Sequence, residues 1–241
     1  MARENSSIAR NLSLIRERIE RAAARSGRAA GEITLVAVSK TFPVEYIQEA
    51  YAAGVKHFGE NRVQEWESKQ ARVVQLDAVW HLVGHLQSNK AARAARLFHT
   101  VDSLDSLDLA RRLDRGVAGA SMQSQASRLR VLIEVRLDAA PSKSGASDAE
   151  LPALVDGVLA LPHLDLQGLM GVPPPFGDPE RARPIFRRLR ALRDAAAART
   201  GSPLPVLSMG MSHDFEVAVE EGATELRIGS ALFGARKTET V

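Results

Sequence analysis

Residues 33–43 read ITLVAVSKTFP, and the apolar and β-branched run at its start ends on a lysine, Lys40. A short continuous run of this kind is typical of a strand that is covered on both faces, as in a parallel sheet. Residues 44–53 then show the apolar spacing of a helix. A strand followed by a helix is the unit of a parallel β/α fold. The stretch therefore predicts such a fold, and it leaves an ammonium group at the tip of a buried strand to be explained.

The same strand-and-helix unit recurs along the chain. Strands are predicted at residues 33–39, 56–58, 79–83, 97–101, 130–135, 166–170, 205–208 and 225–228. Helices are predicted at residues 44–53, 62–72, 89–95, 104–115, 148–160, 179–199 and 215–221. Eight units in 241 residues come close to the length of about 250 residues that is typical of a (β/α)8 barrel. An open doubly wound sheet would carry a Gly-x-Gly-x-x-Gly turn after its first strand, and this sequence has none there.

The predicted fold is therefore a single (β/α)8 TIM-type barrel over residues 1–241, with an extra N-terminal helix. That helix is expected at residues 4–25, where apolar residues recur on one stripe and Gly27 is a natural stop. Residues 116–127, GVAGASMQSQAS, are predicted to be a loop before the fifth strand. The sequence shows no linker to a second domain.

Composition excludes several classes of function. The chain is 45% hydrophobic and 25% charged, as in an ordinary globular protein, and it has no cysteine for a disulfide, a thiolate zinc site or a nucleophile. The N-terminus mixes charges without the apolar centre of a secretory signal. No segment reaches about 20 uninterrupted apolar residues. We expect a cytoplasmic protein with no membrane partner.

Neither nucleic-acid binding nor metal binding is expected. The formal charge is +3, but the densest basic run, residues 181–193, reads as a solvated outer helix face and lacks stacking aromatics. His81 and His85 have a spacing that would suit zinc on a helix. They fall instead on a predicted strand broken by Gly84, so they are expected to point in different directions.

The chemistry of a barrel lies at the C-terminal ends of its strands, and Lys40 stands at such an end. If the mouth desolvates its ammonium group, the pKa of Lys40 falls, and a neutral amine can form a Schiff base with an aldehyde. The alternative is a lysine that extends into solvent. Its position alone does not decide between them.

Two glycine- and hydroxyl-containing turns follow strands seven and eight, and each opens a helix. They are residues 208–212, SMGMS, where Ser212 is expected to cap the helix, and Gly229-Ser230. Such turns resemble the phosphate site common in barrels, although they could be two capped helices and no more. Asp214 and Glu216 already compensate the first helix dipole, so Gly229-Ser230 is expected to be the stronger phosphate contact.

Strands one and eight are neighbours in a closed barrel, so a phosphate group held by these turns would lie beside Lys40. An aldehyde that carries a phosphate is pyridoxal 5'-phosphate (PLP). Six motifs then point to a family: AVSKTFP (37–43), HFGENRVQE (57–65), WHLVGHLQSNK (80–90), PSKSG (141–145), LQGLMGVPPP (166–175) and LSMGMSHDFEVAVEEGATELRIGSALFGAR (207–236). With these motifs the chain, from about residue 8 to residue 236, resembles the pyridoxal-phosphate homeostasis family, whose members are similar to the N-terminal barrel of alanine racemase.

The resemblance implies that Lys40 carries PLP as an internal aldimine and that Arg227 faces the pyridine nitrogen. It implies phosphate contacts from Ser208, Gly229 and Ser230, and a place for Asn61 near the ring or its hydroxyl. His85 is expected near the cofactor at the tip of strand three. The predicted cofactor-binding residues are Lys40, Asn61, His85, Ser208, Met209, Arg227, Ile228, Gly229 and Ser230.

The catalytic set looks incomplete beside this binding set. Arg227 can donate to the pyridine nitrogen but cannot protonate it, which leaves the ring a weak electron sink. In the racemases that the chain resembles, the second base is a tyrosine from a C-terminal β-domain, whereas Tyr46 and Tyr51 fall on the helix after strand one. We expect a monomeric PLP-binding protein that buffers or delivers the cofactor, with apo-enzymes as candidate partners and no turnover of its own. The alternative is a PLP-dependent amino-acid racemase or a related enzyme.

Overall fold

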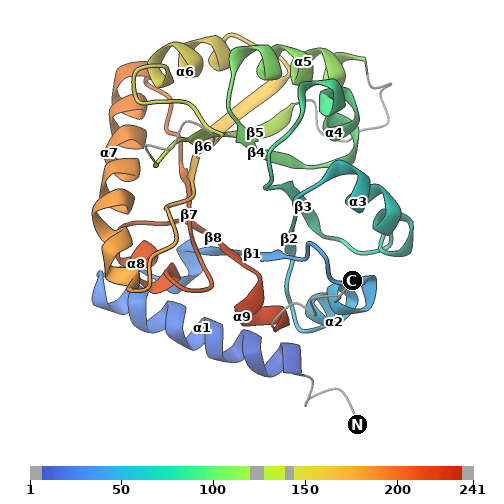
Figure 1. Ribbon diagram of the computed structural model, residues 1–241, viewed down its shortest axis with the longest axis vertical. Helices are drawn as coiled ribbons and strands as arrows, with labels where there is room; N and C mark the ends of the chain where they lie inside the picture. The colour runs from blue at the N-terminus through green and yellow to red at the C-terminus, as the bar shows by residue number, and fades with distance from the viewer. Residues whose placement is uncertain (1–6, 120–127, 139–143, 235–241) are drawn as a thin grey trace.

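The computed structural model describes residues 7–119, 128–138 and 144–234, and it shows a closed barrel of parallel strands ringed by helices (Figure 1). The strands pair in sequence order, and β8 pairs back with β1. They are β1 (Thr34–Val38), β2 (His57–Glu60), β3 (Val79–Leu82), β4 (Thr100–Leu104), β5 (Leu129–Val135), β6 (Leu164–Gly171), β7 (Val206–Met211) and β8 (Glu225–Ile228). The predicted (β/α)8 barrel is confirmed.

The helices cover the outside of the barrel. They are α1 (Ser7–Arg25), α2 (Val44–Ala52), α3 (Val63–Lys69), α4 (Ala91–Leu97), α5 (Leu107–Ala118), α6 (Leu151–Leu159), α7 (Arg183–Thr200), α8 (Phe215–Glu220) and α9 (Ser230–Phe233). Short 3-10 turns cover Ala30–Glu32, Gln70–Arg72, Ser88–Lys90 and Pro179–Ala182. Within the described ranges, no helix combines the length and the apolar character that crossing a bilayer requires.

The first strand shows how the sequence builds the barrel. Successive side chains of a strand point to opposite faces. Ala37 belongs to the apolar core that the strands share with the helices, whereas Val36 and Val38 are buried on the other face, toward the barrel axis. Both faces of β1 are therefore covered, which is why its sequence is a continuous apolar run.

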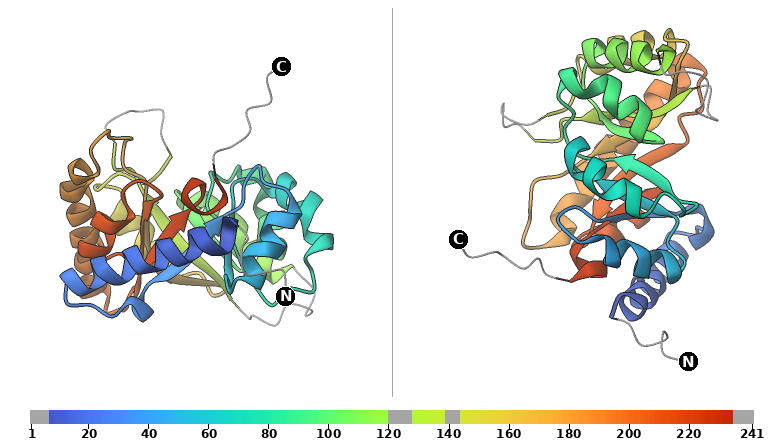
Figure 2. Two further views of the ribbon diagram at one scale, coloured as in Figure 1. Left: turned by 90° about the horizontal axis from the view of Figure 1, so that it is seen from below. Right: turned by 90° about the vertical axis from the view of Figure 1, so that its right-hand side faces the viewer.

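The predicted N-terminal helix is confirmed for its described part. Helix α1 buries the stripe Ile8, Leu12, Ile15 and Ile19, and Gly27 follows its end with φ +69°, the left-handed conformation that suits glycine. The helix runs along the outside of the barrel beside α8 and α9 (Figure 2). It thus braces the elements that follow the last two strands.

Strand β4 was misplaced by the sequence pattern. The strand was predicted at residues 97–101, yet it covers Thr100–Leu104, and Leu97 ends helix α4. Asp102 and Ser103 therefore lie within the strand and not after it, and both are fully buried. Polar residues on β4 broke the apolar run because the inner face of this strand meets other polar side chains inside the barrel.

The predicted loop at residues 116–127 was also partly wrong. Helix α5 continues to Ala118, so its first residues are helical, while residues 120–127 lie outside the described residues. Gly116 fits a helix here because a Cβ at that position would come within 2.9 Å of the Cα of Ala92 on α4. The glycine allows the two helices to pack closely.

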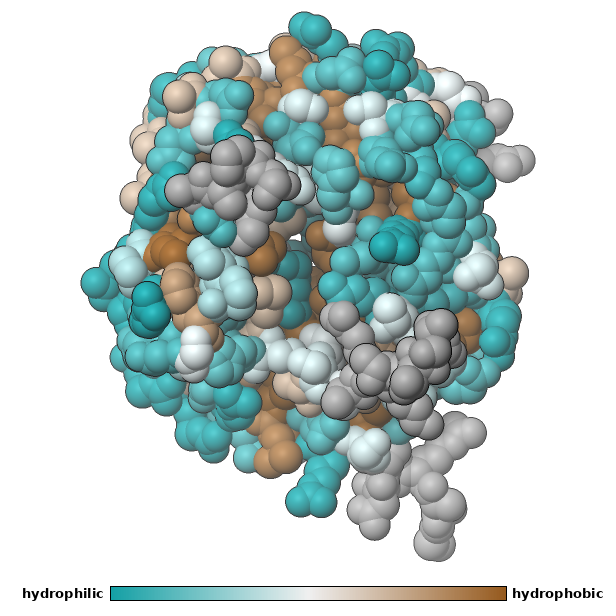
Figure 3. All heavy atoms as spheres, viewed as in Figure 1, coloured by the Kyte–Doolittle hydropathy of each residue, from teal (hydrophilic) through white to brown (hydrophobic). Residues whose placement is uncertain are grey.

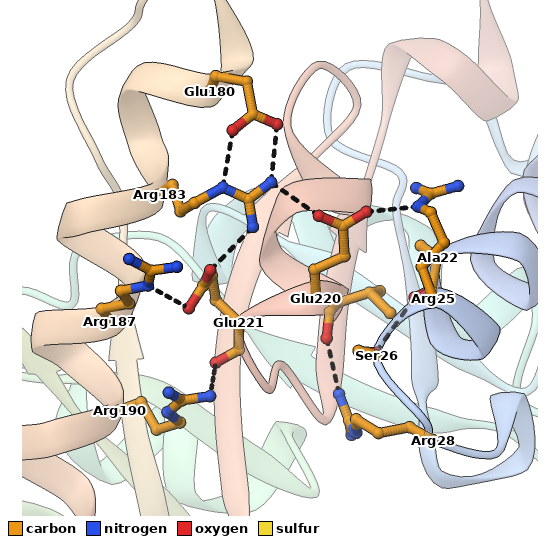
Figure 4. Close-up of polar contacts among 11 residues, drawn as sticks. Ala22, Arg25, Ser26, Arg28, Glu180, Arg183, Arg187, Arg190, Glu220 and Glu221 are labelled. Carbon is orange, nitrogen blue, oxygen red and sulfur yellow. Dashed lines mark hydrogen bonds and ion pairs between the residues drawn. The ribbon is translucent and has the colours of Figure 1, made fainter.

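An ion-pair network joins α7, α8 and α1 on the outside of the barrel (Figure 4). Arg183 donates to Glu180, Glu220 and Glu221 at 2.7, 2.7 and 2.8 Å, and Arg25 of α1 donates to Glu220 at 2.7 Å. Part of the dense basic run at residues 181–193 is therefore neutralised by the chain's own carboxylates.

Candidate functional site

The face seen in Figure 3 is hollowed near its centre, where the barrel axis reaches the surface. Lys40 follows β1 at this end and is half-buried. Strand β8 runs beside β1, with Ile228 opposite Ala37. A Cβ on Gly229 would lie 3.5 Å from the carbonyl oxygen of Val38. The structure therefore brings the β8–α9 turn next to the Lys40 turn, as expected from the neighbouring places of the first and last strands.

The turns after β7 and β8 meet through Ser212. The backbone N–H groups of Gly229 and Ala231 both donate to the Ser212 hydroxyl oxygen, at 3.3 and 3.1 Å. Converging N–H groups at the start of a helix are the donors that hold phosphate oxygens in many proteins. In this chain two such groups aim at one acceptor, the Ser212 hydroxyl, and one of them belongs to the turn that lies next to the Lys40 turn.

The expected helix cap at Ser212 was wrong. Helix α8 begins at Phe215, so Asp214 occupies the N-cap position, and its Oδ1 accepts the N–H of Met211 at 2.7 Å. Burial raises the pKa of Asp214, while the bond from Met211 acts in the opposite direction. The Ser212 hydroxyl is left to bridge to the β8–α9 turn because it lies two residues before the N-cap of α8.

Arg227 and Ser208 contact each other directly across β7 and β8. The Nη1 of Arg227 donates to the Ser208 hydroxyl oxygen at 2.6 Å, and its Nη2 donates to the carbonyl oxygen of Gly171 at 2.9 Å. Both side chains are buried. Burial lowers the pKa of Arg227, against the attraction of Glu225 and other carboxylates. These bonds hold the guanidinium at a defined place in the barrel.

The other predicted site residues are distributed around the same mouth. Asn61 follows β2. Its backbone packs closely on Gly84, because a Cβ atom on Gly84 would lie 2.4 Å from the carbonyl oxygen of Asn61. His85 is exposed at the tip of β3, with Nδ1 3.4 Å from Asp105. Met209 and Ile228 belong to the apolar core, so a contact from either to a cofactor would come from its backbone. Ser230 is exposed at the start of α9.

Comparisons with known proteins show the family to which the chain belongs. The family described as alanine racemase, N-terminal domain, matches residues 10–237. The pyridoxal phosphate homeostasis protein of Aquifex aeolicus is 43% identical over 226 residues, which cover 94% of this chain and 97% of that protein. The chain belongs to the pyridoxal phosphate homeostasis family. The family member of Escherichia coli K12 is 41% identical, with 95% and 97% covered.

Solved structures give the family a three-dimensional reference. PipY of Synechococcus elongatus PCC7942, in a structure with PLP bound, matches with a TM-score of 0.78 and 38% identity over 90% of this chain and 100% of that one. Alanine racemase from Corynebacterium glutamicum matches with a TM-score of 0.69 over 98% of this chain and 62% of that one. The identity of 19% to the racemase shows a shared fold alone.

Below the mouth, this family member carries a column of ionisable side chains that the sequence did not predict. His81 lies at the centre: its Nε2 is 3.0 Å from Nδ1 of His57, and its Nδ1 is 3.0 Å from Asp102 and 3.8 Å from Glu225. These residues come from β2, β3, β4 and β8, so they can meet only inside the barrel. The available signal was a polar residue inside each of the short runs VWHLV, TVDSL and ELRI.

The pKa values within this column are shifted by burial and by the charges of neighbouring groups. Burial acts to lower the pKa of His81, but Asp102 and Glu225 outweigh it, and the pKa is raised. Burial and the nearby His81 lower the pKa of His57 to about 4. Burial, followed by Asp102, raises the pKa of Glu225, whose Oε1 has no hydrogen-bond partner among the described residues. The arrangement fits a neutral His57 that accepts from a charged His81.

A metal ion fits this column poorly. His81, Asp102 and Glu225 offer ligand atoms within 4.8 Å of one another. However, Asp102 is already paired with His81, and the positive charge of Arg227 acts on both carboxylates. A divalent cation would add to this positive charge in a region of low dielectric.

The prediction that His81 and His85 point in different directions is confirmed, since His81 is buried in the barrel and His85 is exposed.

Proposed function

We propose that the chain binds PLP at the barrel mouth and holds it as an internal aldimine on Lys40. The observation that carries this proposal is the position of the turn that carries Lys40 next to the β8–α9 turn, where the N–H groups of Gly229 and Ala231 converge. An amine is what an aldehyde requires, and converging N–H groups suit a phosphate. The PLP-bound structure of PipY and the names of the relatives support it.

The binding reaction needs no further reactant. PLP supplies an aldehyde; the neutral amine of Lys40 adds to the aldehyde carbon, and the carbonyl oxygen leaves as water. Gly229, Ser230 and the Ser212 hydroxyl would hold the phosphate. Ser208, for which the resemblance implies a phosphate contact, would also orient Arg227, which donates to its hydroxyl oxygen and does not give up its proton.

The remaining predicted contacts concern the ring. β2 and β8 lie on the two sides of β1. Asn61 follows β2 and His85 follows β3, so both would approach the ring from the β2 side, whereas the phosphate would be held on the β8 side. Met209 and Ile228 would contribute backbone atoms, since their side chains lie in the apolar core. Arg227 would face the pyridine nitrogen. A permanently charged donor there favours binding over carbanion chemistry, because it leaves the ring a weak electron sink.

We further propose that this binding serves PLP homeostasis, by buffering the cofactor or delivering it to apo-enzymes. The family membership supports a carrier without turnover of its own, and so does the lack of an evident second base among the described residues. A tyrosine is the second base in the racemases, but both tyrosines of this sequence have other contacts. Tyr51 accepts a hydrogen bond from Lys56 at 2.8 Å, and Tyr46 packs on the rings of Phe42 and Phe233. The monomeric state and the cytoplasmic location remain predictions from the sequence.

The test is absorbance of the PLP-loaded protein. Wild type should show an aldimine band, and borohydride should fix the cofactor to the peptide that contains Lys40. Lys40→Ala should lose both, because no amine is left at that site. Lys56→Ala is the matched control, since Lys56 contacts Tyr51 on the outer helix layer. A band of equal strength in Lys40→Ala would refute the assignment.

A racemase or related enzyme is the second candidate, because alanine racemases share the fold. Incubation of the loaded protein with a panel of amino acids in deuterated water would measure exchange at the α-carbon. A carrier should give no exchange above that of free PLP. Enzyme-like exchange that depends on Lys40 would favour catalysis.

A further inference from the structure

A second lysine, Lys69, lies behind the turn that carries Lys40. It is the last residue of α3, and its side chain is only 10% exposed. Its ammonium group donates to the carbonyl oxygen of Ser39 at 3.1 Å, to Glu60 at 3.0 Å and to Glu65 at 2.7 Å. Ser39 directly precedes Lys40, so one of these bonds reaches the backbone next to the proposed cofactor residue.

Both carboxylates of this cluster also bind the same turn. The Ser39 hydroxyl donates to Glu60 at 2.7 Å, and the backbone N–H of Thr41 donates to Glu65 at 2.5 Å. The residue before Lys40 and the residue after it are therefore held by one group of charges. We call Glu60, Glu65 and Lys69 the β1 clamp.

The turn needs such support because its backbone is strained. Thr41 has φ +67°, in the left-handed region where a β-branched residue is an outlier. Strained conformations persist only where the surrounding structure holds them, and they gather at functional sites. The bond from Thr41 N–H to Glu65 is made in this conformation, and Lys69 holds the Glu65 carboxylate in place through its own bond.

The clamp acts from the side opposite the site. Ser39 points toward Glu60, which shares its face of β2 with Phe58 in the core beneath the helices. By the alternation of the strand, Lys40 then leaves toward the barrel axis. The contacts of Lys69 therefore act on the site through the backbone on either side of Lys40.

We propose that Lys69, acting through Glu60 and Glu65, is a positioning residue that holds the Ser39–Thr41 backbone so that the Lys40 amine is presented to the aldehyde of the cofactor. The inference rests on the proposed function, in which Lys40 carries PLP. Without Lys69, two neighbouring carboxylates would lose their common cation, and the left-handed turn would lose its support.

The experiment compares two ligands on full-length Lys69→Met. One is PLP, and the other is 4'-deoxypyridoxine 5'-phosphate, which has the ring and the phosphate but no aldehyde. We expect PLP binding to weaken about tenfold or more, while binding of the analogue changes less than about twofold. Equal weakening of both ligands, or no change in either, would overturn the proposal.

Glu65→Gln and Glu67→Gln provide a matched pair on α3. Both side chains are 23% exposed, and Glu67 pairs with Arg93 and not with the clamp. The PLP-to-analogue affinity ratio should fall in Glu65→Gln and stay at its wild-type value in Glu67→Gln. If Lys69→Met does not fold, this pair still decides, since equal ratios in the two variants would contradict a role for the clamp.

A rescue separates the turn from other effects of Lys69. Glycine adopts positive φ without strain. The single variant Thr41→Gly should therefore bind PLP nearly as well as the wild type. The double variant Thr41→Gly, Lys69→Met should recover much of the affinity that Lys69→Met alone loses. No recovery in the double variant would show that Lys69 does not act through the turn. Retention of the aldimine band by Lys40→Ala would instead refute the proposed function, whatever Lys69 does.

Discussion

Two groups of ion pairs in this molecule look alike but lie in different surroundings. In the β1 clamp, Glu60 and Lys69 are buried, and the charges of the clamp bind the backbone beside Lys40. The network of Arg183, Arg187, Glu220 and Glu221 joins the outer helices, and although Glu221 is only 5% exposed, its partner Arg187 is 61% exposed (Figure 4). Water screens the outer pairs, whereas a buried charge depends on its partners. We therefore expect burial and backbone contact, more than the number of ion pairs, to decide which group affects function.

The largest effect on stability is expected from the buried group. Lys69→Met leaves Glu60 and Glu65 without their shared cation, and breaking a buried pair in this way costs about 3 kcal/mol of unfolding free energy. Part of this loss should be relieved at low pH, because burial raises the pKa of Glu60, while Lys69 lowers it. Urea unfolding of the wild type and of Lys69→Met, at neutral pH and near pH 5, measures the difference in their unfolding free energies. A loss no larger than that of Arg183→Met would remove the contrast between the two groups.

The interior column adds a pH-dependent case of intermediate size. Burial and the charge of His81 lower the pKa of His57 to about 4 in the folded protein, below the value of about 6.5 for an unfolded histidine. Between these two values the unfolded chain binds more protons, so stability should fall as the pH falls from 6.5 toward 4. With allowance for the partial exposure of His57, we expect about 1 kcal/mol.

His57→Gln should make this acid limb shallower when unfolding free energy is measured at a series of pH values. His99→Gln is the control, although burial also lowers the pKa of His99. The charge of His81 also lowers that pKa, but the His99 ring accepts the N–H of Trp80, whereas His57 contacts His81 directly at 3.0 Å, so removal of His99 should change the slope less. An unchanged slope in His57→Gln would contradict the neutral state of His57.

A smaller effect is expected from the outer network. Arg183→Met removes bonds to Glu180, Glu220 and Glu221, but Glu180 is 57% exposed, and the other two carboxylates keep their bonds to Arg25 and Arg187. We expect a loss of about 1 kcal/mol that shrinks in high salt. Unfolding in low and in high salt measures this, and PLP binding should be unchanged in both. A salt-independent loss, or weaker PLP binding, would mean that the network reaches the site.

The smallest effect is expected for an isolated exposed pair. Glu45 and Arg72 are joined at 2.5 Å, and both side chains are more than half exposed. Glu45→Gln should therefore leave the urea midpoint unchanged within error, because exposed pairs of this kind contribute little. A measurable loss would show that exposure is a poor guide to the importance of ion pairs in this protein.

Local sequence patterns predicted most of the fold. The continuous run of β1, the stripe of α1 and the stop at Gly27 depend on neighbours in the chain, and each was recognised from them. The pattern failed at β4, where Asp102 interrupts the apolar run because it meets His81 from another strand. A polar barrel interior hides a strand from a method that looks for apolar residues.

The candidate site was predictable to the extent that topology determines it. In a closed barrel the first and last strands are neighbours, so Lys40 and Gly229 had to lie close together. The role of Ser212 was not predictable in this way. Its hydroxyl could cap α8 or bridge to the β8–α9 turn, and only the positions of both turns decide between them.

The sequence by itself determined the strand-and-helix order, the barrel that this order closes, and the placing of a lysine and a glycine turn at its mouth. The tertiary structure alone decided which charges meet. Lys69, Glu60 and Glu65 reach the Lys40 turn, and Glu225 reaches His81 from a distant part of the chain. The reason is physical: hydrophobic periodicity is a local property, whereas ion pairs and hydrogen bonds act over a few ångströms and depend on the packing of the whole barrel.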